Sequence, residues 1–211
     1  MKRAKTTLKG RWKDSDFLNS LPIDNQSIKV EFLNNLDLQG VPKLGCGEPL
    51  WKFPDVYSSE VYHLNLSFGD GALTVADSKI TDLKCIEFKF DQASSFRKST
   101  FFDSFFTRAK LKFNATDVEF HRCDFSESML KGGFHEYGFR RCKFFSCRFS
   151  SAQWQNTYLF ACRFIDCDFT DFKVLKSAIK GFKVNTAIDS VFSVFEDCEI
   201  DGLVKEYSYK L

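Results

Sequence analysis

Residues 142–170 read CKFFSCRFSSAQWQNTYLFACRFIDCDFT, and a large apolar residue returns at every fifth position of this stretch. The same period runs from Ser94 to Ile179, and a small residue stands two positions before most of the large ones. The large residues are Phe96, Phe101, Phe106, Leu111, Phe120, Phe125, Leu130, Phe134, Phe139, Phe144, Phe149, Trp154, Leu159, Phe164, Phe169, Val174 and Ile179. This period decides the fold.

A period of five suits neither a helix nor a long strand. Five helical residues turn through about 500°, so the apolar stripe would drift around the helix. In a strand, an odd period sends successive apolar residues to opposite faces. The chain must therefore turn a corner every five residues, and residues two apart on each short side both point inward.

Breaks in the period indicate how many sides form one coil. Val75, Ile80, Cys85 and Phe90 form one set, which we number as the first to the fourth side. The step from the fourth side back to the first is irregular: six residues from Phe90 to Phe96, four from Leu111 to Ala115 and, on our reading, four from Leu130 to Phe134. Irregularity at one corner predicts four-sided coils of about 20 residues. The inward columns would then include Phe106, Phe125, Phe144 and Phe164, and separately Phe101, Phe120, Phe139 and Leu159.

The words Cys123-Asp124-Phe125-Ser126-Glu127, Cys147-Arg148-Phe149 and Cys167-Asp168-Phe169-Thr170 resemble the motif of the pentapeptide-repeat family. The resemblance covers about residues 75–200 and is closest in style to the fluoroquinolone-resistance branch. It implies an all-β fold, a right-handed quadrilateral β-helix with the central residue inside. Residues 61–202 would form this β-helix, residues 1–60 an N-terminal cap or accessory segment, and residues 203–211 a C-terminal tail.

Composition supports a packed protein. The 211 residues are 44% hydrophobic and 27% charged, with a net charge of +2, which excludes a disordered chain and a strongly basic nucleic-acid binder. No apolar run is long enough to span a membrane, and the N-terminus lacks an apolar signal region, so we expect a cytoplasmic protein. The basic residues before Asp14 are interpreted as a mobile, solubilising terminus, with a nucleic-acid arm as the alternative.

Candidate chemistry is sparse. Cys142, Cys147, Cys162 and Cys167 could form a four-thiolate zinc site, but the repeat explains their spacing as inward packing positions. On that reading Cys123, Cys142 and Cys162 share one column, and Cys147 and Cys167 share another. His121 and Cys123 would point to opposite sides of the wall, which disfavours a nucleophile pair. We predict no enzyme, and no catalytic, cofactor or metal site.

Outward positions carry large apolar and basic residues that have no role in the core. The second side is expected to expose Phe102, Arg140, Arg141, Tyr158 and Phe160, and the third side Phe145, Arg163 and Ile165. Aromatic and arginine side chains are enriched at binding hot spots. The alternative is that these rings only cover the corners. We take the eight residues as candidates for a partner-binding surface.

Three functions compete. The first is a noncatalytic protein-binding scaffold that uses the flat faces of a rigid rod. The second, implied by the resemblance to the resistance branch, is a DNA mimic that binds a type II topoisomerase such as gyrase and protects it; residues 75–200 carry 19 basic against 17 acidic side chains, so they lack the acidic surface. An enzyme is the third. We expect an unidentified protein partner, no membrane contact, no direct nucleic-acid binding, and a monomer unless the ends pair.

Overall fold

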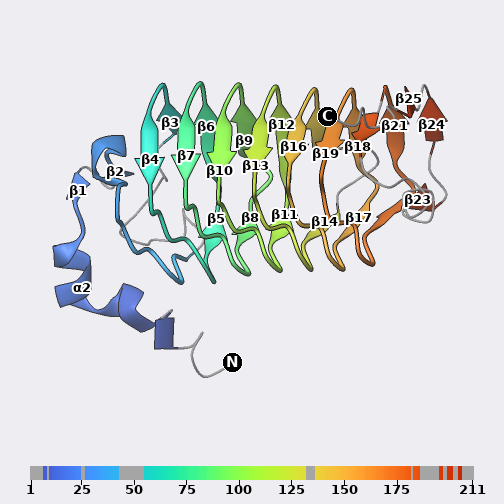
Figure 1. Cartoon of the computed structure of the whole chain (residues 1–211). Coiled ribbons are helices and arrows are strands. Elements are labelled where there is room, and N and C mark those ends of the chain that lie inside the picture. Colours follow the sequence, from blue (N-terminus) through green and yellow to red (C-terminus); the bar gives the residue numbers. More distant parts are fainter. Residues whose placement is uncertain are drawn as a thin grey trace.

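The protein is a parallel β-solenoid with four sides, three of which are continuous sheets (Figure 1). The computed structural model describes residues 7–8, 10–24, 27–42, 55–131, 136–181, 183–185, 195–196, 199–201 and 204–205. The described helices are short, and none is long and apolar enough to cross a membrane. The all-β solenoid predicted from the period of five is confirmed, while its right-handed sense stays a prediction.

The first two sides are eight-stranded sheets. The first side contains β3 (Val56–Tyr57), β6 (Thr74–Ala76), β9 (Ser94–Arg97), β12 (Phe113–Thr116), β15 (Gly138–Arg140), β18 (Tyr158–Phe160), β21 (Ala178–Lys180) and β24 (Glu199–Asp201). The second side contains β4 (Glu60–Tyr62), β7 (Lys79–Thr81), β10 (Thr100–Phe102), β13 (Glu119–His121), β16 (Lys143–Phe145), β19 (Arg163–Ile165), β22 (Lys183–Asn185) and β25 (Val204–Lys205).

The third side is narrower, and the fourth is a seven-stranded sheet. On the third side, single parallel bridges join Asp37, Asn65, Lys84, Phe105, Asp124, Arg148 and Asp168. The fourth side contains β5 (Asp70–Gly71), β8 (Lys89–Phe90), β11 (Lys110–Leu111), β14 (Met129–Lys131), β17 (Gln153–Gln155), β20 (Lys173–Leu175) and β23 (Phe195–Glu196). The inner coils therefore pair with the coils above and below them on all four sides.

Left-handed backbone makes the regular corners. The residue two positions after the inward one has a positive φ, as at Asp82 (54°), Asp103 (49°) and Asn156 (54°). Asp and Asn tolerate this conformation better than most residues, because their short polar side chains bond locally. Arg108, Arg122 and Arg141 adopt it as well, so stacking between coils outweighs a local cost at these corners.

Stacked aromatic rings fill the core. Phe144 is fully buried and stacks on Phe120 at 5.0 Å and on Phe164 at 4.5 Å between ring centroids. A neighbouring column holds Phe106, Phe125 and Phe149, with centroid separations of 4.8 and 5.3 Å. The small residues two positions earlier, including Ser94, Ser104, Ala109, Cys142 and Thr157, are buried too. The inward slots predicted from the sequence are thus confirmed for these residues.

The predicted columns are wrong by one side after residue 131. Ala115 pairs with Phe139, and Phe120 pairs with Phe144, so 24 residues separate the members of each pair. The return step at this coil covers nine residues, from Leu130 to Phe139, instead of four. Phe134, which we had assigned to an inward slot, lies outside the described residues. The irregular corner itself is where the sequence predicted it.

Five cysteines follow the corrected columns. Cys123, Cys147 and Cys167 share one column, and Cys142 and Cys162 share the next, because the pairing of β13, β16 and β19 brings these positions together. Each thiol donates to a backbone carbonyl of the preceding coil; for example, Cys147 Sγ lies 3.3 Å from the oxygen of Phe120. The described cysteines are free and buried, as expected for packing residues.

The N-terminal segment packs on the first coils. It comprises η1 (Arg11–Lys13), α2 (Ser15–Ser20), β1 (Ile23–Asp24), β2 (Ser27–Ile28) and η2 (Val30–Phe32). Trp12 is buried, and its indole nitrogen donates to the oxygen of Gln39 at 3.0 Å. Arg11 forms an ion pair with Asp37 at 3.3 Å. The interpretation of the basic terminus as mobile is therefore wrong for residues 11–13. The coil strands begin at Val56, and the division at residues 60 and 202 remains a proposal.

Candidate functional site

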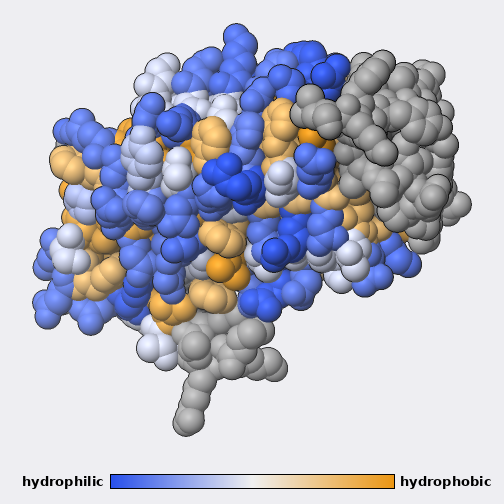
Figure 2. Space-filling view, in the orientation of Figure 1, coloured by the Kyte–Doolittle hydropathy of each residue, from blue (hydrophilic) through white to orange (hydrophobic). Residues whose placement is uncertain are grey.

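An outward row of three rings and one isoleucine side chain crosses the second side. The register of β10, β13, β16 and β19 aligns Phe102, His121, Phe145 and Ile165 on successive coils. The His121 ring stacks between Phe102 at 4.8 Å and Phe145 at 4.5 Å, with interplanar angles of 20° and 11°. Figure 2 looks onto this side and shows apolar side chains as islands in a row, with polar side chains between them. We call these four residues the apolar row.

A charged column borders the apolar row. Glu119 accepts hydrogen bonds from Lys143 Nζ at 2.8 Å and contacts His121 Nε2 at 3.2 Å. The hydrogen bond from Lys143, with a smaller contribution from the bond to His121, holds the pKa of Glu119 below its ordinary value. The next residue of the column, Arg163, lies directly beside Lys143 in the register of β16 and β19. Two cations therefore lie on adjacent strands here, an arrangement that by itself disfavours sheet pairing.

An arginine lies over rings on the first side. The Arg140 guanidinium is 5.4 Å from the centroid of Phe160 and 6.0 Å from that of Tyr158. The Tyr158 hydroxyl donates to Asn114 Oδ1 at 2.8 Å, and burial raises the pKa of the phenol. A Cβ at Gly138 would lie 2.2 Å from the oxygen of Tyr158, so only glycine allows β15 and β18 to approach this closely.

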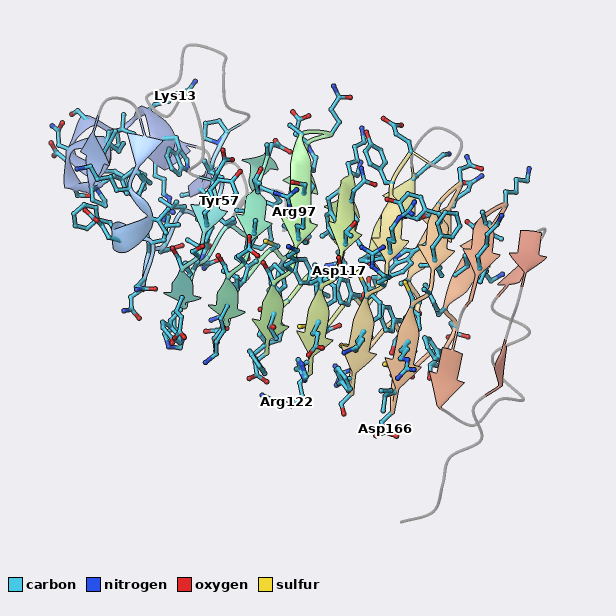
Figure 3. The ribbon with its side chains drawn as sticks, turned by 90° about the horizontal axis from the view of Figure 1, so that it is seen from above. Lys13, Tyr57, Arg97, Asp117, Arg122 and Asp166 are labelled. Atoms are coloured by element: carbon cyan, nitrogen blue, oxygen red, sulfur yellow. The ribbon has the colours of Figure 1, made fainter. Side chains whose placement is uncertain are left out.

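Paired ions tie the corners between coils. Arg141 donates to both carboxylate oxygens of Asp117, at 2.6 and 2.7 Å. Arg122 does the same to Asp103, at 2.7 and 2.8 Å. In each pair the arginine holds the pKa of the aspartate below its ordinary value. Asp117 and Arg122, labelled in Figure 3, mark the two corners that border the second side. Arg141 is therefore engaged within the chain.

All eight candidate residues lie on two adjoining sides and their shared corner. Arg140, Tyr158 and Phe160 lie on the first side and Arg141 on the corner, whereas the sequence analysis placed them on the second side. Phe145, Arg163 and Ile165 lie on the second side, one side earlier than predicted. Only Phe102 keeps its predicted side. The nine-residue return step causes both errors. The apolar candidates are half-buried and the three arginines exposed.

Two members of this surface were missed. His121 was considered as a possible nucleophile partner of Cys123, and neither His121 nor Glu119 was among the predicted binding residues. Both residues belong to this surface because of the residues that lie beside them on the neighbouring coils. They occupy the outward positions on either side of Phe120, and the correct pairing of the coils would have placed them next to Lys143 and Phe145.

The surface offers hydrogen-bonding groups and apolar side chains for contact. Among the residues that the structure describes, no group of three or more His, Cys, Asp or Glu side chains could hold a metal ion. Burial raises the pKa of Cys85 and Cys162, which keeps these thiols protonated and unreactive.

The five-residue words, four-sided coils and inward columns together define a β-solenoid of the pentapeptide-repeat type. No family model and no curated protein matches the chain. Similar solved structures include QnrB1, a plasmid-mediated fluoroquinolone resistance protein, with a TM-score of 0.43 and 11% identity over 81% of this chain and 91% of that chain. Another is HetL, a pentapeptide repeat protein involved in heterocyst differentiation regulation from the cyanobacterium Nostoc, with a TM-score of 0.26 and 10% identity over 81% and 88% of the two chains. At such identities the likeness concerns the fold alone.

Proposed function

We propose that the chain is a noncatalytic, cytoplasmic scaffold that binds a protein partner along the edge between the first and second sides. The observation that carries this proposal is the apolar row beside Lys143 and Arg163, with Arg140 over Phe160 across the corner. Apolar and cationic groups together are typical of interface hot spots. The partner surface that fits best is acidic with exposed apolar side chains.

A second argument is the positive charge of this edge. The ion pairs between coils join opposite charges, as in Asp103–Arg122 and Asp124–Arg148. Glu119 pairs with Lys143, and Arg163 lies directly beside Lys143 as a second cation in the register of β16 and β19. Two adjacent cations beside the apolar row favour a partner surface that carries carboxylates.

The alternative is a DNA mimic that protects a type II topoisomerase. A flat, rigid rod suits it, but mimicry of a phosphate backbone needs negative charge on the docking surface. Arg140, Lys143 and Arg163 give this edge the opposite sign. We therefore favour a protein partner that presents acidic groups, and we take the scaffold as a monomer.

The test is capture of a partner from a native lysate by immobilised variants. Phe160→Ala with Arg140→Ala should reduce capture at least about tenfold, since each hot-spot truncation typically costs over 1 kcal/mol. The matched control is Phe105→Ala with Lys84→Ala, an exposed ring and a cation on adjacent coils of the third side. Equal loss with both double variants would contradict the proposal.

Two further arms separate the alternatives. Deleting residues 1–6 removes much of the basic terminus but keeps Trp12 in the core, and capture should be unaffected. A deletion through residue 13 is unsuitable because it would remove Trp12. Purified gyrase, assayed for supercoiling with a fluoroquinolone, tests the mimic directly. If the wild-type chain protects gyrase and the variant with the edge substitutions protects it equally well, the alternative is favoured.

A further inference from the structure

A block of lysines lies on the fourth side, away from the proposed docking edge. Lys89 and Lys110 pair directly in the register of β8 and β11, and Lys110 pairs in turn with Met129 of β14. Lys112 and Lys131 follow two positions after Lys110 and Met129, on the same outward surface. All four lysines are exposed, and Met129 is 47% exposed in their midst. We call these five residues the lysine block.

The lysine block places like charges side by side, which is rare among the paired strands of this structure. Within the described sheets, residues paired in register carry like charges only at Lys89–Lys110 and in the Lys143, Arg163 and Lys183 column. Asp70 neutralises Lys89, since its Oδ1 lies 3.3 Å from Nζ. In the part of the chain that the structure describes, Lys110, Lys112 and Lys131 have no such ion pair.

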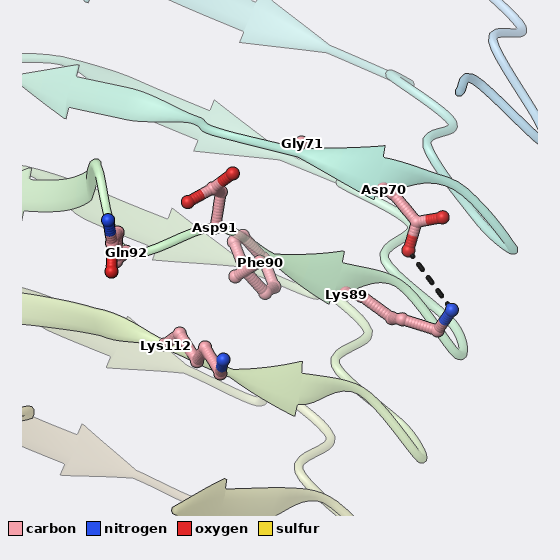
Figure 4. A pocket seen from close by; sticks show the side chains of 7 residues that line it. All are labelled: Asp70, Gly71, Lys89, Phe90, Asp91, Gln92 and Lys112. Atoms are coloured by element: carbon pink, nitrogen blue, oxygen red, sulfur yellow. Dashed lines mark ion pairs between the residues drawn. The ribbon is translucent and has the colours of Figure 1, made fainter. Parts of the chain in front are cut away.

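A pocket adjoins the block. It has a volume of about 410 Å³ and is lined by Asp70, Gly71, Lys89, Phe90, Asp91, Gln92 and Lys112 (Figure 4). It lies beside the corner where the step from Phe90 to Phe96 is one residue longer than usual. The fourth side thus offers a cavity and an exposed thioether next to Lys110, Lys112 and Lys131, for which the described residues show no ion pair.

We propose that the lysine block binds an acidic, extended peptide segment of a partner protein, with an apolar side chain of that segment against Met129. Alternate residues of an extended peptide are about 7 Å apart, which is also the spacing of Met129 and Lys131 along β14. An apolar side chain and a carboxylate on alternate residues of the peptide therefore match Met129 and the Lys131 ammonium group. Methionine adapts its shape to varied apolar partners.

The chemistry of the block favours a peptide over a nucleic acid. Single-stranded nucleic acids are usually held by aromatic side chains on which bases stack. The described residues that point outward from β8, β11, β14 and β17 are Lys89, Lys110, Met129, Lys131, Gln153 and Gln155, and none is aromatic. None is an arginine, the residue suited to bidentate phosphate contacts. This site lies on a different side from the proposed docking edge and does not depend on it.

Fluorescence anisotropy with the full chain tests the proposal. The probe is a short fluorescein-labelled peptide rich in glutamate with a central leucine. Lys110→Glu with Lys131→Glu should weaken binding at least about tenfold, because two attractions become repulsions. The matched control, Lys79→Glu with Lys98→Glu, makes the same change in net charge on other sides and should change affinity less than about twofold. Met129→Gln should weaken binding of this peptide but not of a version with serine replacing leucine.

Stability and specificity measurements complete the design. Lys110→Glu alone should raise the melting temperature by about 1–3 °C, because it replaces a like-charge pair with an attractive one. Loss of binding with unchanged or raised stability supports a binding role for Lys110. Equal weakening by both double variants, no binding of the peptide, or tighter binding of a single-stranded oligonucleotide of equal charge would overturn the proposal. Loss of peptide binding in the Phe160→Ala, Arg140→Ala variant would also overturn it, and would assign the peptide to the docking edge.

Discussion

Truncation of one central ring tests the packing of the rod. Phe144 is fully buried and stacks on Phe120 and Phe164 with interplanar angles of 8° and 12°. Its edges contact Phe139 and Phe149 at centroid separations of 5.3 and 5.4 Å. Replacing it with alanine removes contacts above, below and to both sides.

The expected cost is large. Deletion of a buried phenylalanine side chain costs about 3–5 kcal/mol, depending on how far the surroundings collapse into the cavity. Aromatic pairs are worth about 0.5–1.5 kcal/mol beyond the area they bury. Since Phe144 loses two stacked partners and the hydrogen-bonded coils resist collapse, we expect Phe144→Ala to reduce the free energy of unfolding by about 5 kcal/mol, the upper end of that range.

Phe160→Ala is the matched control. Phe160 points outward and is half-buried, with Tyr158 at 5.1 Å and the Arg140 guanidinium at 5.4 Å. Its truncation should cost about 1 kcal/mol. Urea denaturation followed by circular dichroism measures both variants, provided that the m-value is unchanged. Similar shifts of the midpoint in the two variants would refute the assignment of inward and outward slots.

Three further predictions follow from the contacts between coils. Gly138→Ala should destabilise the folded protein by about 2 kcal/mol or more in thermal denaturation, because the new Cβ would lie 2.2 Å from the oxygen of Tyr158. The control Gly10→Ala should be neutral, because nothing lies within 4 Å of a Cβ at that position. Equal effects of the two substitutions would contradict the close approach at Gly138. Arg122→Gln should lower stability at neutral pH. Arg122 lowers the pKa of Asp103 in the folded state, so the ion pair stabilises the folded protein at pH values above the unfolded pKa of 3.8. This stabilisation is lost as the pH falls through the folded pKa, and the urea midpoints of the variant and the wild type should therefore converge in acid. A difference between the midpoints that stays constant with pH would be evidence against this linkage. Cys142 and Cys162 should stay unlabelled by iodoacetamide in the native protein and react on unfolding, as read by peptide mass spectrometry, whereas fast native labelling would show that the thiols are accessible.

Much of the fold follows from the period of five, because a corner every five residues leaves few alternatives. The inward slots at Phe125 and Phe144, and the irregular corner, were predictable for this reason. The length of the return step at residues 131–138 was not. Gly132 stands two positions before Phe134 and satisfies the small-residue rule, so the sequence favours the shorter step. Tyr137 occupies the slot before Phe139 and is too large for the rule, although the fold buries it.

The candidate surface depended on that step. The sequence assigned the candidates after residue 131 to the side that follows their true side. Since all of these candidates shifted by the same single side, most of them kept the neighbours that were predicted. The shift separated Phe102 from Phe145, however, and so concealed the apolar row through His121. The packing of Trp12 was also unpredictable, since it depends on a contact with Gln39 that no local pattern encodes.

Site-specific photo-crosslinking tests the proposed docking edge most directly. A photoreactive phenylalanine analogue would replace Phe160 on the first side or Phe145 on the second, and Phe105, which is 36% exposed on the third side, would be the control position. The proposed function predicts that positions 160 and 145 crosslink the same protein from a native lysate and that position 105 does not. Crosslinking of that protein through position 105 alone would contradict it.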